Sequence, residues 1–212
     1  MNVVDNQTEL IPLFSMPLYK SYIEPLKDSV VEAIKNMEYN YIPSVTNESN
    51  INQYGLVTDS KTLHMMPKFL FLKSIIDSKV SHFTKQVLCV DNFDLKMHTM
   101  WAVKHTEGNW AFKHSHKNCL ISGILYVDVH PNCGAVVFEK PLHYLNLFPS
   151  CFTPSYTHQT IYNSSVFGVE PENNMILLFP SHLEHFVLAN NSGKDRYCLS
   201  FDYFLNGQIK VS

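Results

Sequence analysis

The spacing of apolar residues changes near residue 92, and this change constrains the fold more than any other feature of the chain. Before it, apolar residues recur every three or four positions over 26–37 and 69–87, which is the spacing of amphipathic helices. Pro25 and Pro67 stand at the starts of these stretches, where proline is favoured as the first helical residue. The N-terminal part is therefore predicted to contain two helices.

After residue 92 the chain consists of short segments rich in β-branched and aromatic residues, separated by Pro, Gly, Asn or Ser. Short strands with turn residues between them are typical of an antiparallel sandwich or barrel. We therefore predict a mainly β fold with the N-terminal helices packed on one sheet. The predicted strands cover about 93–103, 119–129, 134–139, 143–148, 159–167, 174–180, 184–189 and 195–204.

Length and composition favour one soluble domain. A chain of 212 residues is predicted to be a single domain, with an N-terminal strand and helices over 1–92 and a β core over 93–206. A net charge of −3 without a basic run argues against nucleic-acid binding. Five scattered cysteines without a CxxC pair, and no apolar run long enough for a membrane span or signal peptide, predict a cytoplasmic protein.

His114 and His116 stand two positions apart, and His185 follows far downstream. Successive side chains of a strand point to opposite faces, so the pattern predicts that His114 and His116 share one face. In an antiparallel jelly roll, the strand that leads to His185 can lie close to theirs. We interpret the three histidines as a metal site; histidines on the surface or in the core are the alternative.

Arg196 is the only arginine among 16 basic residues. It shares one face of a predicted strand with Cys198 and Ser200. If that face lines the interior, an unpaired guanidinium would be costly, and a carboxylate that binds both of its nitrogens would offset the cost. A surface ion pair is the alternative for Arg196.

Three runs of sequence resemble the core of the Fe(II)/2-oxoglutarate-dependent oxygenases. They are Lys-His-Ser-His-Lys-Asn-Cys-Leu-Ile-Ser-Gly-Ile-Leu-Tyr-Val-Asp-Val (113–129), Cys-Gly-Ala-Val-Val-Phe-Glu-Lys-Pro (133–141) and Leu-Leu-Phe-Pro-Ser-His-Leu-Glu-His-Phe-Val (177–187), with Arg196 after the third. The resemblance covers about residues 98–204 and is closest to oxygenases of phages and marine bacteria. It implies a double-stranded β-helix, the jelly-roll fold of cupins.

The resemblance also implies the chemistry, a dioxygenase that uses Fe(II), 2-oxoglutarate and O2 to hydroxylate a C–H bond. His114 matches the first histidine of the family's His-x-acid motif, and His185 matches its distal histidine. His116 falls where most of the family has Asp or Glu.

The cosubstrate residues follow from the same comparison. Arg196 matches the basic residue that pairs with the distal carboxylate of 2-oxoglutarate, while the keto acid end chelates the iron. Ser200 matches a hydroxyl partner of that carboxylate, and Tyr126 matches a frequent cosubstrate contact.

His116 is the departure from the family pattern, because the usual non-haem iron site has two histidines and one carboxylate. Three neutral imidazoles would leave the site more positive by one charge. We predict that His116 is the third ligand and forms the catalytic site with the other two histidines. In one alternative, Asp128 or Glu139 is the third metal ligand. In the other, His116 contacts a metal ligand without binding the metal itself.

A second resemblance, to the cupins, implies the same fold with a different function. Gly108 precedes His114 by the spacing of the first cupin motif, and Pro180 and His185 echo the second, but the expected Glu after His-x-His is absent. This alternative is a three-histidine metalloenzyme without 2-oxoglutarate, which leaves Arg196 unexplained. The remaining alternative is a non-catalytic jelly-roll protein that binds a structural metal or none.

The sequence does not name the substrate: a small molecule, a nucleotide and a protein side chain all stay open. Loops predicted over 40–62 and 149–160 would shape that choice. Trp101 and Trp110 flank the approach to His114 and are predicted to pack in the core or at the rim; lining a substrate entry is the alternative. Five other histidines have no ligand spacing and are predicted to be ordinary: His98, His105, His130, His143 and His158.

Overall fold

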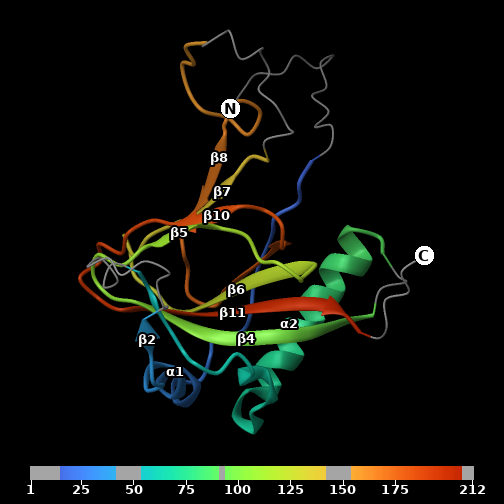
Figure 1. Cartoon of the computed structure of the whole chain (residues 1–212), viewed down its shortest axis with the longest axis vertical. Coiled ribbons are helices and arrows are strands. Elements are labelled where there is room, and N and C mark those ends of the chain that lie inside the picture. Colours follow the sequence, from blue (N-terminus) through green and yellow to red (C-terminus); the bar gives the residue numbers. More distant parts are fainter. Residues whose placement is uncertain (1–14, 42–53, 91–93, 142–153, 207–212) are drawn as a thin grey trace.

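The computed structural model describes residues 15–41, 54–90, 94–141 and 154–206, which form two β-sheets that face each other (Figure 1). Every pair of neighbouring strands in these sheets is antiparallel. The larger sheet has the order β1 (Tyr19–Tyr22), β9 (Met175–Pro180), β6 (Ile121–Asp128), β11 (Arg196–Leu205), β4 (Leu95–His105), β3 (Leu56–Val57) and β2 (Asn40–Tyr41). The smaller sheet has the order β5 (Ala111–His114), β10 (His185–Val187), β7 (Val136–Glu139) and β8 (Val166–Val169). The predicted mainly β fold is confirmed.

Most of the predicted strands are present, and the exceptions have local causes. Only the end of the predicted strand 159–167 is extended, because a turn closes before it, with Asn163 Oδ1 accepting a hydrogen bond from the Thr160 N–H at 2.7 Å. The predicted strand 143–148 lies outside the described residues. β5 is not among the strands predicted from the turn residues, because its four residues do not alternate between apolar and polar; only its last residue, His114, was placed on a strand.

The region 40–62, predicted to be a loop, contains two strands of two residues each. β2 and β3 pair with each other, and β3 pairs with β4, so they extend the larger sheet at its edge. Residues 42–53 between them, and 149–153 of the other predicted loop, lie outside the described residues. Residues 154–160, the rest of that second loop, contain no strand or helix.

Two α-helices, α1 (Asp28–Lys35) and α2 (Leu70–His82), lie within the predicted helical stretches. α1 begins three residues after Pro25, since Asn174 Oδ1 accepts the N–H of Leu26 at 3.1 Å and holds the chain against the sheet there. Pro67 opens a 3-10 turn that leads into α2, and a π-helical turn, Phe83–Val87, extends α2 at its end.

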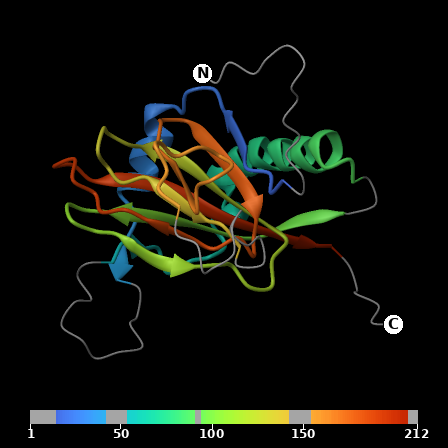
Figure 2. The same ribbon diagram turned by 90° about the horizontal axis from the view of Figure 1, so that it is seen from above.

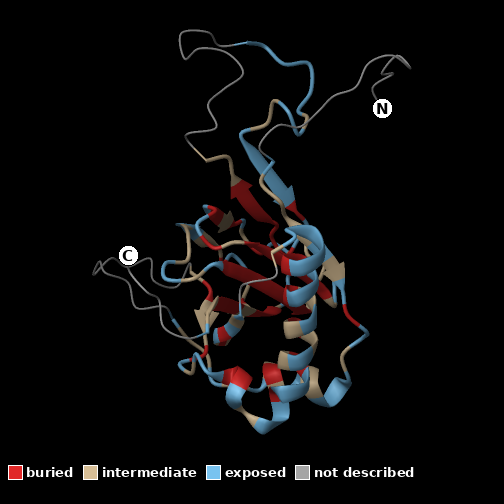
Figure 3. Cartoon of the chain, turned by 90° about the vertical axis from the view of Figure 1, so that its right-hand side faces the viewer, coloured by how far each residue is buried: buried red, intermediate tan, exposed pale blue. Residues whose placement is uncertain are grey.

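The helices cover the outer face of the larger sheet and bury one apolar core there (Figures 2 and 3). Ile34 of α1 and Ile76 of α2 are fully buried in this core, together with Leu199 and Phe201 of β11. A second apolar core lies between the two sheets and includes Cys198 of β11. The predicted alternation along β11 is therefore confirmed. No helix in the described part of the chain is both long and apolar enough to cross a membrane.

Candidate metal centre and cosubstrate pocket

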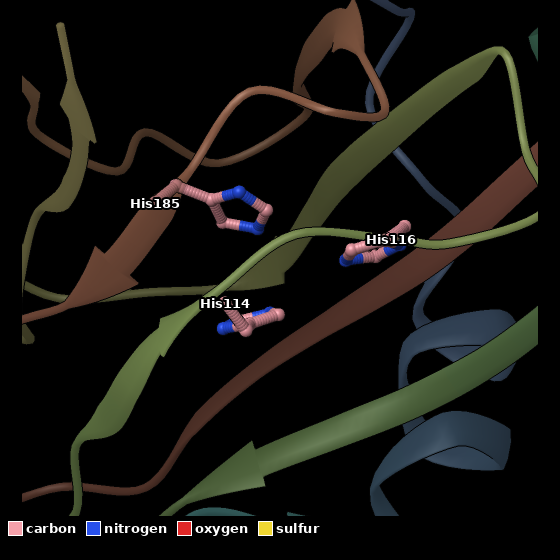
Figure 4. A group of neighbouring side chains, drawn as sticks. All are labelled: His114, His116 and His185. Atoms are coloured by element: carbon pink, nitrogen blue, oxygen red, sulfur yellow. The ribbon is translucent and has the colours of Figure 1, made fainter. Parts of the chain in front are cut away.

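Three histidines meet between the sheets where β5 and β10 pair (Figure 4). His114 is the last residue of β5 and lies opposite His185, the first residue of β10. His116 lies beyond the end of β5, so the prediction that His114 and His116 share a strand is wrong. Its backbone N–H donates to the Ser181 carbonyl at 2.9 Å, and this bond turns His116 back toward the other two. Potential ligand atoms of the three residues all lie within 4.8 Å of one another.

Each of these imidazoles uses Nδ1 for a hydrogen bond within the protein. Because the acceptors are carbonyl or carboxylate oxygens, Nδ1 carries the proton, and Nε2 is left with the lone pair that a metal needs. Burial lowers the pKa of His185 to about 3 and also lowers that of His114, so both rings are neutral at pH 7. The acceptors are the Phe112 carbonyl for His114 at 2.7 Å, the Leu183 carbonyl for His185 at 2.9 Å, and Asp202 Oδ1 for His116 at 2.5 Å.

Asp202 is the functional residue that the sequence did not reveal. It lies on β11, two positions after Ser200 on the face that lines the pocket, and it is only 6% exposed. Ser122 Oγ donates to Asp202 Oδ1 at 2.6 Å, and Thr99 Oγ1 donates to Oδ2 at 3.0 Å. Burial by itself would raise the Asp202 pKa, but the hydrogen bonds that it accepts, first that of His116, lower it. Asp202 is therefore a carboxylate that orients His116.

The two carboxylates considered from the sequence lie elsewhere. Asp128 pairs with Lys35 at 3.1 Å, and Glu139 pairs with Lys113 at 3.1 Å. The metal-competent group found among the described residues contains neither of them. These geometries contradict the alternative in which Asp128 or Glu139 completes the site.

A pocket of about 780 Å³ is lined by the three histidines and extends to Arg196. The Arg196 side chain is 2% exposed, and its Nη1 donates to the Gly134 carbonyl at 2.9 Å. Its Nε has no partner, and within the described part of the chain Arg196 forms no ion pair. The alternative of a surface ion pair is therefore wrong. A buried guanidinium that pairs with no acidic side chain among the described residues can bind an anion.

The other predicted cosubstrate residues lie beside Arg196. Ser200 and Cys198 line the pocket on the same face of β11. Tyr126 is fully buried, its ring centre is 5.3 Å from the Arg196 guanidinium, and its hydroxyl has no partner. Tyr126 is not among the residues that line the pocket, and its ring stabilises the guanidinium by a cation–π contact.

Comparison with known proteins agrees with this geometry. Residues 99–202 match the family described as "Putative 2OG-Fe(II) oxygenase". This segment belongs to the 2OG-Fe(II) oxygenase superfamily. The match spans β4 to β11 and includes all three histidines and Arg196. The protein is therefore a 2-oxoglutarate-dependent non-haem iron oxygenase. No curated protein sequence matches the chain significantly.

Solved structures of oxygenases share the fold at low sequence identity. The epimerase SnoN from nogalamycin biosynthesis is 11% identical, with a TM-score of 0.60 over 89% of this chain and 78% of that one. HygX from Streptomyces hygroscopicus, with nickel and 2-oxoglutarate bound, is 13% identical, with a TM-score of 0.55 over 89% and 82%. A prolyl-4-hydroxylase from Pseudomonas putida is 13% identical, with a TM-score of 0.53 over 89% and 93%. The oxygenase fold predicted from the sequence, a double-stranded β-helix, is thereby confirmed.

Proposed function

We propose that this oxygenase is an Fe(II)- and 2-oxoglutarate-dependent dioxygenase that hydroxylates its substrate and binds iron through His114, His116 and His185. The observation that supports this most strongly is the arrangement of three imidazoles, each with Nε2 available, around one point in a pocket that also contains the unpaired Arg196. Three protein ligands leave further positions on the metal open, as a catalytic site requires.

The donor set fits ferrous iron despite the missing carboxylate ligand. Asp202 accepts a hydrogen bond from the Nδ1–H group of His116. The negative charge of Asp202 therefore lies next to His116, which occupies the position where most of the superfamily has an acid as ligand. A carboxylate behind a ligating histidine raises the basicity of that ligand and fixes its orientation. The extra positive charge of a three-histidine site is thereby partly compensated.

The protein residues bind and orient, and the cofactors supply the redox chemistry. When bound, iron, 2-oxoglutarate and O2 supply the oxidation, in which decarboxylation of the keto acid accompanies hydroxylation of a C–H bond. Arg196 binds the distal carboxylate, with Ser200 as a hydroxyl partner on the same strand face. The apolar walls between the sheets, which include Phe179 and Val187, keep water away from the reacting groups.

The substrate enters through the exposed end of the pocket, where aromatic side chains gather. Trp110 packs against Tyr54 with ring centres 5.0 Å apart, and Lys61 Nζ lies 4.8 Å above the Trp101 ring. Solved neighbours bind substrates of different kinds: HygX has been solved with hygromycin B, and a prolyl hydroxylase from Trichoplax adhaerens with a peptide fragment. We propose a small molecule or a protein side chain as the substrate.

We place the protein in the cytoplasm, and its origin among phage or marine bacterial genomes. The first part rests on the scattered cysteines, and the second on the sequence resemblance described above. Fractionation of the source cells would test the first proposal, and the genes that flank the coding sequence would test the second.

The proposed function is tested by anaerobic titration of the Fe(II)-loaded protein with 2-oxoglutarate, following the visible metal-to-ligand charge-transfer band. The wild type should develop the band, and Arg196→Ala should show a much weaker band at the same cosubstrate concentration. The two variants should bind equal amounts of iron, since Arg196 is not a ligand.

Other outcomes would select the alternatives. Bound iron without a band in the wild type would favour the cupin-type three-histidine enzyme. Absence of iron binding would favour a non-catalytic jelly-roll protein.

A further inference from the structure

We infer that His105 is a third residue of the cosubstrate site and donates a hydrogen bond to the distal carboxylate that Arg196 binds. This inference rests on the proposed function, because it assigns a residue to the 2-oxoglutarate site.

Unpartnered buried polar atoms cluster around Arg196. In the described part of the chain, four buried side-chain nitrogen or oxygen atoms lack a hydrogen-bond partner. Such atoms are rare in folded proteins, because leaving each one unsatisfied costs free energy. One of them, Nδ1 of His64, belongs to a residue that does not line the pocket. The other three are His105 Nδ1, Tyr126 Oη and Arg196 Nε.

The strand register places His105 beside Arg196. The two residues lie directly opposite each other where β4 pairs with β11, so their side chains leave the sheet on the same face. Both side chains line the pocket. His105 is 3% exposed, and its buried Nδ1 has no hydrogen-bond partner. A ligand in the pocket would supply the acceptor that the protein does not.

The surroundings hold the His105 ring in place. A Cβ atom built at Gly55 would lie 2.1 Å from its Cδ2 and 2.2 Å from its Nε2, so only glycine leaves room for the ring. Asn190 Nδ2 donates to the His105 carbonyl at 2.9 Å and fixes the backbone at this position. The imidazole is therefore positioned before any ligand binds.

His105 is a neutral donor next to a cation. Burial, and then the charge of Arg196, lower its pKa to about 3, so it carries no charge at neutral pH. The pair thus presents one positive charge and an additional N–H group. That combination suits a single carboxylate, which needs one counter-charge and several hydrogen bonds.

The experiment compares two keto acids that chelate iron in the same way. 2-Oxoglutarate has a distal carboxylate and pyruvate has none. Anaerobic titrations of Fe(II)-loaded wild type and His105→Leu, followed by the charge-transfer band, give the dissociation constant of each acid. We expect His105→Leu to weaken 2-oxoglutarate binding by about 10-fold or more, the loss typical of a hydrogen bond to a charged group. The dissociation constant of pyruvate should change by less than about 2-fold, because pyruvate has no distal carboxylate for His105 to bind.

Matched variants separate binding from folding. His64→Leu removes the other buried histidine with an unpartnered Nδ1, outside the pocket, and should leave both affinities unchanged. His105→Asn keeps an N–H donor near the position of Nδ1 and should recover most of the 2-oxoglutarate affinity. If His105→Leu does not fold, Gly55→Ala is the second variant, since its methyl group must displace the ring.

Two results would overturn the inference. One is an unchanged affinity for 2-oxoglutarate in His105→Leu, or in Gly55→Ala if that variant is used. The other is an equal loss for both acids, which would assign His105 a structural role. Failure of the proposed function would look different, because the wild type itself would then show no band with either acid.

Discussion

At the scale of single residues, the metal centre depends on one carboxylate that is not a ligand. Asp202 accepts a hydrogen bond from the Nδ1–H group of His116. It also accepts hydrogen bonds from the hydroxyl groups of Ser122 and Thr99. The side chain at position 116 is a histidine, where most of the superfamily has an acid, and the acid that it contacts lies on β11 of the larger sheet. The site thus retains a carboxylate, displaced outward by one imidazole ring.

Replacing Asp202 by Asn should weaken iron binding by about 10- to 100-fold, the usual effect of removing a partner of a ligating histidine. Asparagine keeps the shape but removes the negative charge that fixes the His116 tautomer. Anaerobic competition with a coloured Fe(II) chelator measures the change. Lys104→Met, which alters an ion pair on the same sheet outside the site, is a control and should bind iron as the wild type does. Equal iron affinity in Asp202→Asn would show that Asp202 does not act through His116.

Arg196→Lys should weaken 2-oxoglutarate binding although the positive charge is kept. The guanidinium donates to the Gly134 carbonyl while its other nitrogens remain free for a carboxylate, and an ammonium group cannot do both in the same plane. We expect the dissociation constant from the charge-transfer band to rise by about 10-fold or more. An unchanged constant would mean that charge alone is sufficient at this position.

At the scale of elements, β6 fits between β9 and β11 because Gly123 has no side chain. A Cβ atom there would lie 2.4 Å from the Phe201 ring of β11 and 2.7 Å from the Leu177 carbonyl of β9. Phe201 in turn packs against the core under the helices. The glycine therefore lets β6, which carries Ser122, pair side by side with β11, which carries Asp202.

Gly123→Val should destabilise the protein by about 3 kcal/mol or prevent folding, because the backbone and the ring cannot both move away. Urea unfolding followed by circular dichroism measures the loss. Gly168→Ala on β8 is the matched control, since its Cβ would meet only Val137 Cγ2 of β7, at 4.0 Å. It should change the free energy of unfolding by less than about 1 kcal/mol. A fully stable Gly123→Val protein would contradict this account of β6.

At the scale of the whole molecule, several buried histidines couple folding to pH. Burial lowers the pKa of His105 and of His185 from 6.5 to about 3, and it lowers the pKa of His64. Between these values the unfolded chain binds more protons than the folded protein. The free energy of unfolding should therefore rise with pH from about 3 to 6.5, and the protein should lose stability as pH falls through that range.

Urea unfolding of the metal-free protein at a series of pH values tests this prediction. The free energy of unfolding should decrease steadily from pH 7 to pH 4, and His105→Asn should show a shallower decrease because one of the titrating groups is gone. A stability that stays constant between pH 7 and pH 5 would show that these histidines are not buried as neutral groups.

The resemblance and the local patterns were enough to place His114, His185 and Arg196 in one site. Their order along the chain is a family signature, and the alternation along β11 follows from the two-residue period of a strand. The spacing of apolar residues predicted where the two helices lie. The strand alternation and the helix spacing depend on residues close together in the sequence, and the order of the site residues depends on the family resemblance, so both can be predicted without the tertiary structure.

The tertiary structure decided what depends on strand register. His116 lies past the end of β5 and contacts Asp202, 86 positions away. This contact forms only because β5 and β10 of the smaller sheet face β11 of the larger sheet. His105, which has no ligand spacing in the sequence, lies beside Arg196 because β4 pairs with β11 at that register. Register is set by packing across the whole sheet, and no short stretch of sequence encodes it. The sequence by itself therefore determined the class of site, and the fold determined which carboxylate and which further histidine complete it.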